Sequence, residues 1–440
     1  MSATSRIISV VILIHLLCAP VYAQEYPISW EPDPWPEIRK ERIQKLLPQA
    51  MMAANVDAWI TICRENNNDP LADHIGGENA SGTAVFLFYF AADGFHSKVF
   101  SPIGESTALD ELDIHDEVIP IGRVESAIRV AGKFIQQQNF KRIAINTSYQ
   151  NELADGLSHS QYQNLTKALG PSAERLVSSD ELVYEWLSVK LPAEIKIMQL
   201  AAELTAEWQV MAYQSIIPGT TTDADVAKFI KERMALYGVG DAWAPDQNPN
   251  VNSGADRGHS HATDKVIMPG DVIQTDFGIR LYDRWVSDIQ RFAYVMHENE
   301  TEAPAAMQAY WENAKAGNRA AYQAMKPGVK GIDVDRAQRE LMKKRNSEYV
   351  MWSTGHPVGY VAHDVGPNLG GSQSSHVRPA AEKQLEVGMT FAFDGFYSWK
   401  RQDGSFKTIS VEEMVVINEE GAEYLIAPQE ALVLIPSLKE

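Results

Sequence analysis

The sequence has only two cysteines, Cys18 and Cys63, among its 440 residues. If the N-terminal segment is removed as argued below, Cys63 alone remains and an intramolecular disulfide is excluded. Positive charge is also scarce, because 39 lysines and arginines against 58 aspartates and glutamates give a formal charge of −19. This imbalance argues against nucleic acid or an anionic membrane as a partner. Only the N-terminus carries a long apolar run, so we expect no permanent membrane span in the mature chain.

Residues 1–23 have the pattern of a cleavable signal peptide. Arg6 precedes a largely apolar stretch, residues 7–18, that is too short for a comfortable permanent anchor. The motif ending at Ala23 predicts cleavage after that residue, and hence an exported protein, periplasmic or secreted. A lipoprotein signal through Cys18 is the alternative, but two bulky leucines precede that cysteine where small residues are expected.

The rest of the chain divides into two regions with different patterns. Residues 24–183 mix short β-prone runs with amphipathic helical stretches, which predicts an N-terminal α/β domain. From Pro192 the order becomes helix, helix and hairpin, with Pro218-Gly219 between the helices. The same order recurs around Pro327-Gly328. We expect residues 184–440 to form an α+β domain from two such copies, related by a pseudo-twofold axis.

Each predicted hairpin carries two carboxylates on one face. Asp276 and Asp288 are expected to pair about residue 282, and Asp394 and Glu412 about residue 403, at an Asp-Gly turn signal. The adjacent Glu413 should face the opposite side. Like charges side by side repel, and proteins tolerate them mainly where a cation neutralises them. The pattern therefore predicts a divalent metal site.

Histidines surround these hairpins. His356 and His363 lie seven residues apart in a glycine-framed segment, and His259 lies upstream, in residues 252–263. A single histidine is more often a core or surface residue than a ligand. Three of them placed around paired carboxylates in one region favour a functional site.

These motifs carry a resemblance to a known family. From about Ser179 the sequence resembles the metallopeptidases that include methionine aminopeptidase, aminopeptidase P and prolidase, which have the pita-bread fold. The N-terminal region is similar to the extra domain of the aminopeptidase P, prolidase and creatinase branch. The matching motifs, in order, are His259 with Thr263, Asp276-Phe277-Gly278, Ser287-Asp288-Ile289 with Arg291, Gly355-His356, His363-Asp364-Val365-Gly366 and Val411-Glu412-Glu413.

The resemblance implies a dinuclear centre. Two divalent metal ions would be bound by Asp276, Asp288, His356, Asp394 and Glu412, and His259 and His363 would contact the scissile amide or the tetrahedral oxyanion. Such a centre lowers the pKa of a bridging water and polarises the carbonyl. Four carboxylates with one imidazole favour manganese, with zinc or cobalt as alternatives. The implied function is removal of the N-terminal residue of short peptides, at Xaa-Pro bonds, by a homodimer.

Three residues depart from the family pattern. Asp394 stands where the family has glutamate, and its shorter arm withdraws the carboxylate by about one methylene, which predicts weaker binding of one metal. Trp352 replaces a histidine that serves the proline pocket of aminopeptidase P and prolidase. Ser410 replaces an arginine two residues before the last ligand.

Two other functions remain open on the sequence. The first is a metal-independent amidohydrolase acting on a non-peptide substrate, as in creatinase, and the second is a non-catalytic binding module of the same fold. Both would be expected to have lost acidic ligands or histidines, whereas this chain retains a carboxylate at every such position.

Overall fold

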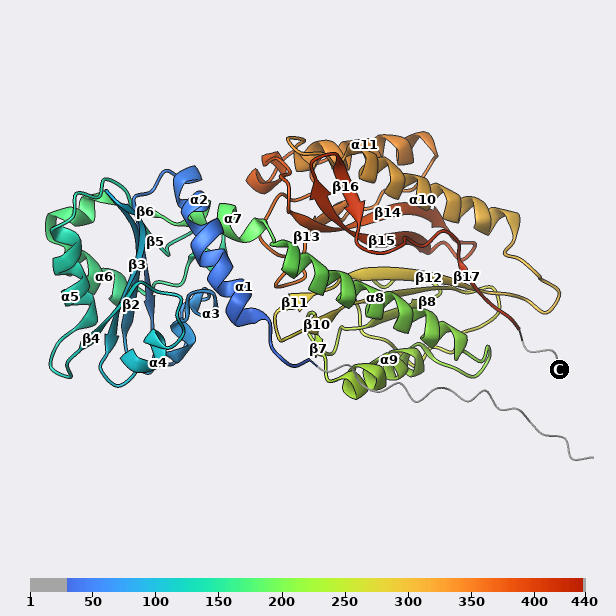
Figure 1. The fold of residues 1–440 in the computed structure, drawn as a ribbon. Helices are drawn as coiled ribbons and strands as arrows, with labels where there is room; N and C mark the ends of the chain where they lie inside the picture. Colours follow the sequence, from blue (N-terminus) through green and yellow to red (C-terminus); the bar gives the residue numbers. More distant parts are fainter. Residues whose placement is uncertain (1–29, 438–440) are drawn as a thin grey trace, which may run out of the picture.

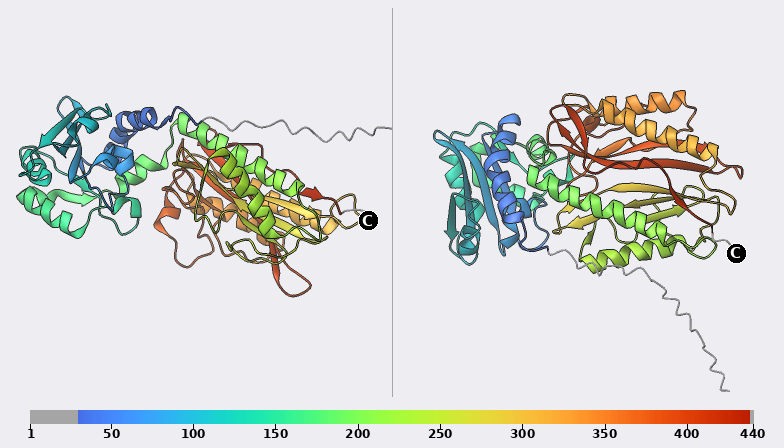
Figure 2. Two further views of the ribbon diagram at one scale, coloured as in Figure 1. Left: turned by 90° about the horizontal axis from the view of Figure 1, so that it is seen from below. Right: turned by 45° about the vertical axis from the view of Figure 1, so that its right-hand side comes forward.

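The computed structural model describes residues 30–437, and the expected signal peptide lies outside these residues. Two units, each built on its own main sheet, lie side by side (Figures 1 and 2). Within the described residues, no helix is both long and apolar enough to cross a membrane.

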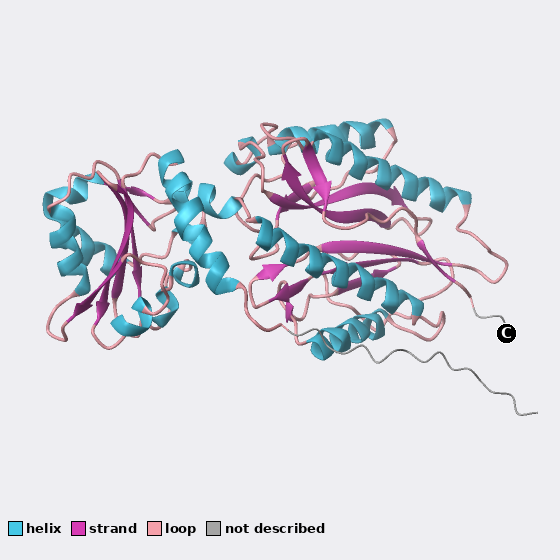
Figure 3. Cartoon of the chain, viewed as in Figure 1, coloured by secondary structure: helices cyan, strands magenta, loops and turns pink. Residues whose placement is uncertain are grey.

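The N-terminal unit is a six-stranded sheet between two helical layers (Figure 3). The strand order is β4-β3-β2-β1-β5-β6. The pairs β1/β2 and β2/β3 are antiparallel, and the pairs β1/β5, β3/β4 and β5/β6 are parallel. Helices α5 and α6 cover one face, and α1, α2 and α3 lie on the other. The strands are β1 (Ala58–Cys63), β2 (Ala84–Ala91), β3 (Gly94–Pro102), β4 (Glu117–Ile121), β5 (Ile143–Ile145) and β6 (Leu176–Ser178). The helices are α1 (Trp35–Glu41), the π-helical turn η1 (Arg42–Leu46), α2 (Leu47–Ala53), α3 (Ala72–Ile75), α4 (Ser106–Asp110), α5 (Ala127–Gln136) and α6 (His159–Leu169), with 3₁₀ turns η2 (Gly77–Asn79), η3 (Glu152–Ala154) and η4 (Gly170–Arg175).

The two units share a buried core. Helix α7 (Asp180–Ser188) contains the expected boundary between residues 183 and 184, and it packs against α2 of the first unit. The Trp35 ring from α1 lies edge-on to that of Trp285 in the second unit, with centroids 5.8 Å apart. The domain boundary at residue 183 therefore stays a prediction, because it falls inside helix α7, which packs against the first unit and leads into the second.

The C-terminal unit is built on an eight-stranded sheet. Its main path is β13-β14-β15-β12-β9-β8, and β16 pairs with β15 while β17 pairs with β12. A smaller sheet, β11-β10-β7, extends one hairpin. The strands are β7 (Gly240–Asp241), β8 (Asn250–Ser253), β9 (Val272–Phe277), β10 (Ile279–Leu281), β11 (Trp285–Val286), β12 (Ile289–Val295), β13 (Gly355–Pro357), β14 (Thr390–Lys400), β15 (Phe406–Asn418), β16 (Gly421–Tyr424) and β17 (Val433–Ile435). The helices are α8 (Pro192–Gln214), α9 (Asp223–Tyr237), α10 (Ala305–Ala324) and α11 (Gly331–Lys344), with the 3₁₀ turn η5 (Pro379–Glu382).

The expected repeat of helix, helix and hairpin is present. Helices α8 and α9 precede the β9/β12 hairpin, and α10 and α11 precede the β14/β15 hairpin. Thr222 caps α9 in a capping box with Asp225. In both copies the first carboxylate follows a glycine by six residues, and Gly270 and Gly388 have matching φ of 89° and 90°. A side chain is strained at such values, so the shared glycine marks the same turn in each copy.

The register of the hairpins was predicted correctly in one case and wrongly in the other. Asp394 lies opposite Glu412, as expected. Asp276, however, lies opposite Gln290 and not Asp288. The reason is the turn, where Tyr282 and Asp283 both adopt left-handed backbone, so the hairpin centres on residue 283 instead of 282. The one-residue change moves the partner by two positions, and because strand side chains alternate with period two, Asp288 keeps the expected face.

Candidate metal centre

The carboxylates gather on the face of the large sheet that the helices leave uncovered. Odd-numbered residues such as Phe277 and Phe393 pack against the helices, in the cores under α8 and α9 and under α10 and α11 respectively. Asp276 and Asp394, one residue away, therefore point to the opposite face. Strands β12 and β15 pair at Gln290 and Glu412, which joins the two hairpins edge to edge. This junction brings both carboxylate pairs to one place.

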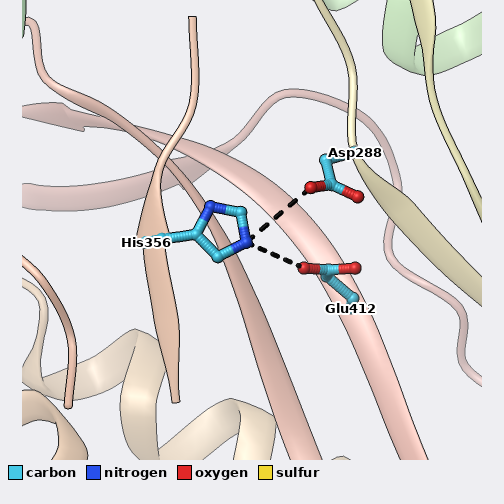
Figure 4. A group of neighbouring side chains, drawn as sticks. All are labelled: Asp288, His356 and Glu412. Carbon is cyan, nitrogen blue, oxygen red and sulfur yellow. Dashed lines mark ion pairs between the residues drawn. The ribbon is translucent and has the colours of Figure 1, made fainter. Parts of the chain in front are cut away.

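Three of the five expected ligands form a compact group, shown in Figure 4. His356 Nε2 lies 3.7 Å from Asp288 Oδ2 and 3.8 Å from Glu412 Oε1. Within the described residues, one ligand atom from each of these side chains falls within 4.8 Å of the others. The distances are too long for hydrogen bonds. They suit a cation about 2.0 to 2.2 Å from each ligand atom.

The tautomer of His356 suits a ligand. Its Nδ1 lies 3.3 Å from the carbonyl oxygen of Pro357, an acceptor only, so Nδ1 carries the proton in the neutral ring. The Nε2 lone pair then faces the carboxylates. Burial and then the neighbouring His363 ring lower the pKa of His356 to about 3, so the ring is neutral near pH 7. A neutral imidazole held by a carbonyl is a common arrangement for a metal-binding histidine.

Asp276 and Asp394 lie outside the compact group but act on it electrostatically. Burial raises the pKa of Asp288 well above its ordinary value, and the charges of Glu412, Asp276 and Asp394 raise it further. The pKa of Asp394 is raised well above its ordinary value in the same way, by burial and then by the charges of Glu412 and Asp276. Burial and Asp276 raise the pKa of Glu412 to about 8. The metal-free cluster thus favours protonated acids, and divalent cations would stabilise the carboxylate forms.

The two histidines expected to contact substrate lie at the edge of this cluster. His259 Nδ1 is 3.3 Å from Asp276 Oδ2, while 77% of its side chain is exposed. The His363 ring stands perpendicular to that of His356, with centroids 4.3 Å apart, and is exposed. Both rings therefore reach solvent beside the carboxylates, which places them where a substrate could bind.

Gln290 is a buried site residue that the sequence analysis missed. Its Nε2 donates to Glu412 Oε2 at 3.0 Å and to Asp394 Oδ1 at 3.4 Å. Its Oε1 accepts from Ser410 Oγ and from Gln274 Nε2, both at 2.7 Å. Its even-numbered position in a strand two residues after Asp288 was the available signal. Ser410, noted above as a departure from the family, thus holds Gln290.

The remaining expectations concern residues beside the centre. Glu413 points away from it, as predicted, because it forms an ion pair with Arg291 at 2.9 Å and accepts from the Gln429 backbone.

Trp352 is exposed and lies edge-on to Phe396, with ring centroids 6.2 Å apart. Phe396 is on the same face as Asp394, two residues further along β14. An apolar ring therefore stands where the family pattern has a histidine.

The donor set fits divalent cations. Buried carboxylates in such number stay charged only when paired or bound to cations, and the described contacts give Asp288, Glu412 and Asp394 no lysine or arginine as an ion-pair partner. Oxygen donors with one imidazole suit manganese and similar ions.

Comparison with known proteins agrees with this geometry. Residues 196–419, just over half of the chain, match the model of metallopeptidase family M24. The Xaa-Pro dipeptidase of Pyrococcus furiosus is 26% identical over 280 residues, which cover 63% of this chain and 73% of that protein. The probable dipeptidase PepE of Mycobacterium tuberculosis is 26% identical over 250 residues, 56% of this chain and 61% of that protein, so the match spans less than two thirds of PepE.

Solved structures show the same fold over nearly the whole chain. The X-Pro aminopeptidase from Thermotoga maritima has a TM-score of 0.66 at 21% identity, covering 88% of this chain and all of that one. The prolidase from Pyrococcus furiosus has a TM-score of 0.60 at 20% identity, covering 87% and 99%. The expected pita-bread fold is thereby confirmed. Its carboxylate centre, its fold and the match of residues 196–419 together show that the chain is a hydrolase that belongs to metallopeptidase family M24.

Proposed function

We propose that the protein is an exported dinuclear metallopeptidase that removes the N-terminal residue of short peptides at Xaa-Pro bonds. The observation that carries the proposal is the group of Asp288, His356 and Glu412, with Asp276 and Asp394 beside it on the uncovered face of the sheet. The names of similar proteins, an Xaa-Pro dipeptidase and an X-Pro aminopeptidase, support the substrate class.

The positions of the five proposed ligands suggest how they would divide between two cations. Asp288, His356 and Glu412 would hold one cation, and Asp276 and Asp394 would complete the site for two, with manganese favoured. When bound, the ions supply a water of lowered pKa and polarise the substrate carbonyl. Asp276, His356, Asp394 and Glu412 lie on paired strands, so these four side chains hold their positions without substrate.

His259 and His363 would contact the peptide. Because Nδ1 of His259 faces Asp276, its Nε2 is the atom available to hydrogen-bond the scissile amide or the oxygen that develops negative charge. His363, exposed beside His356, supplies a second contact from the opposite segment of chain. Their solvent exposure implies that both become buried only when a peptide is bound.

Trp352 and Phe396 would form an apolar wall for the residue after the scissile bond. The family pattern places a histidine at Trp352, and its replacement removes a polar contact while leaving a ring surface that proline or another apolar side chain can cover. We therefore expect cleavage of Xaa-Pro bonds with tolerance for other apolar residues at the second position.

Export and assembly form part of the same proposal. The signal pattern of residues 1–23 supports a periplasmic or secreted protein that begins at Gln24, and family resemblance supports a homodimer. N-terminal sequencing of the protein recovered from outside the cytoplasm tests the first point, since an N-terminus other than Gln24 contradicts it. Analytical ultracentrifugation of the mature protein tests the second.

The activity is tested on metal-free protein reconstituted with manganese, zinc or cobalt. Hydrolysis of an Xaa-Pro dipeptide and tripeptide is compared with that of matched Xaa-Ala peptides, with His356→Ala as the control. Dependence on added metal, with about two ions bound per chain, is expected. Turnover that survives complete chelation would instead indicate a metal-independent amidohydrolase. Stoichiometric metal without hydrolysis of any peptide would indicate a binding module.

A further inference from the structure

A buried ion pair joins the two units of the molecule. Arg42, in the first unit, donates from Nη1 to Glu194 Oε2 at 2.6 Å, and the two side chains are only 1% and 0% exposed. The same guanidinium also donates to the backbone carbonyls of Val189 and Trp186. Glu194 lies in the first turn of helix α8 of the second unit. Burying a charged pair is costly, so its orientation depends on every donor that surrounds it.

Glu194 ties three segments of chain together. Besides Arg42, it accepts from the backbone N–H of Leu191 at 2.8 Å, from Trp285 Nε1 at 3.1 Å and from the Tyr360 hydroxyl. Trp285 lies three residues before Asp288, and Tyr360 lies between His356 and His363. One buried carboxylate thus contacts both segments that flank the metal centre.

The segment with Tyr360 is fixed further by Asp364. Asp364 Oδ2 accepts from the Tyr360 backbone N–H at 2.9 Å and lies 3.2 Å from Lys190 Nζ, in a second ion pair whose side chains are 1% and 0% exposed. The Asp364 N–H donates to the Pro357 carbonyl at 3.0 Å. His363 stands between these two tied residues while its own ring is exposed. Its position is therefore set by the buried contacts of its neighbours.

We propose that Arg42 is a positioning residue, which through Glu194 and Tyr360 sets the place of His363 relative to His356. The N-terminal unit then contributes to the catalytic geometry through this buried chain of contacts. The proposal rests on the proposed function for its kinetic consequence, and its structural part, the position of the His363 ring, can be measured without turnover. Misplacement of a substrate-contacting group by about 1 Å can lower turnover by about two orders of magnitude.

Tyr360→Phe is the sharpest test, because it removes only the hydroxyl. The ring keeps its edge-on contact with His74, at 4.7 Å between centroids, so folding should be preserved. We expect kcat to fall roughly 10- to 100-fold, with metal affinity unchanged and KM changed little. In metal-free protein, the ring NMR signals of His363, assigned with His363→Ala, should shift while those of His259 stay in place.

The role of Arg42 is tested by a double variant that removes both charges of the Arg42–Glu194 ion pair. Arg42→Met alone leaves a buried, unpaired Glu194 and risks misfolding, so it is combined with Glu194→Gln, which keeps the amide near the Tyr360 hydroxyl. The double variant should reproduce the loss of kcat. Arg39→Met is the matched control, since Arg39 lies one helical turn away and is also buried, but it binds Glu78 and the Asp73 carbonyl within its own unit. Arg39→Met should leave kcat and the His363 signals unchanged.

Each outcome has a defined meaning. If Tyr360→Phe and the double variant change thermal stability alone, with kcat and the His363 signals unchanged, the network is structural and the proposal is overturned. It is also overturned if Arg39→Met lowers kcat equally, or if the variants lose bound metal, because the network would then act on the unit interface or on the ligands. Shifted His363 signals in a protein that cleaves no peptide would support the positioning role while refuting the proposed function.

Discussion

Replacing Gln290 with leucine should weaken metal binding although Gln290 is not a proposed ligand. Its amide donates to Glu412 at 3.0 Å and, over a longer 3.4 Å, to Asp394. Without this donor, both carboxylates must be oriented by the incoming cation. A hydrogen bond to a charged group contributes about 1.5 to 3 kcal/mol, and counting one good and one marginal bond gives about 2 kcal/mol. At about 1.4 kcal/mol per factor of ten, this corresponds to a Kd for manganese raised roughly 30-fold.

The measurement is isothermal titration calorimetry of metal-free protein with manganese. Gln274→Leu is the matched control, because Gln274 touches Gln290 Oε1 from the far side, while Ser410 still holds that oxygen. The control should change the Kd by no more than about fivefold, since one neutral hydrogen bond contributes about 1 kcal/mol or less to such a difference. Circular dichroism would check that both variants fold.

Three results would refute this reasoning. A Kd for Gln290→Leu within threefold of the parent protein would show that the carboxylates are oriented without the amide. Equal losses in Gln290→Leu and Gln274→Leu would show that the strand pairing, and not the donor to Glu412, controls the affinity. Tighter binding would show that the amide competes with the cation for the carboxylates.

Four further outcomes are expected. Asp394→Asn should abolish binding of one ion and nearly all peptide hydrolysis, as seen by metal analysis and assay, because a neutral amide cannot replace a carboxylate that would bind a dication; unchanged metal and activity would exclude Asp394 as a ligand. His363→Ala should slow turnover by at least about 100-fold while leaving metal content intact, whereas loss of metal would mark it as a ligand. Trp352→His should raise the ratio of Xaa-Pro to Xaa-Ala cleavage severalfold, and an unchanged ratio would remove Trp352 from the specificity pocket. Burial lowers the pKa of Lys407 to about 8, so the folded protein loses this proton at a lower pH than the unfolded chain does. The free energy of unfolding should therefore rise from pH 8 to pH 10. Lys407→Met should flatten that rise in thermal melts.

Local sequence signals predicted the second hairpin and the helices well. The Asp-Gly turn at residues 403 and 404 fixes the β14/β15 register, and Gly404 does adopt the left-handed conformation that this turn requires. Pro192 and Thr222 mark helix starts because a proline at the first turn and a threonine cap satisfy the free N–H groups there. Each of these features depends on a few adjacent residues, which a sequence displays directly.

The features that sequence analysis missed depend on residues that are not local. Tyr282 adopts a left-handed backbone in the first turn, although the turn contains no glycine or asparagine to indicate it. The predicted centre of the hairpin was therefore one residue too early. Gln290 is neutral and resembles any polar strand residue until β12 is paired with β15. Arg42 and Glu194 are 152 positions apart, and nothing in either neighbourhood indicates the other. Such contacts follow only from the assembled fold.

The proposed metal ligands and the proposed substrate contacts lie on different kinds of structure. The proposed carboxylate ligands lie on or next to strands of two hairpins that meet at a single residue pair, Gln290 and Glu412, so their spacing is as rigid as the sheet itself. His259 and His363 instead lie on exposed segments. Protons relieve the repulsion among these fixed carboxylates in the metal-free cluster, and a divalent cation relieves it more strongly because it carries two positive charges. The exposed rings of the two histidines can contact a peptide as it enters. A substitution at the sheet junction should therefore change metal affinity first, and one in the buried contacts behind His363 should change turnover first.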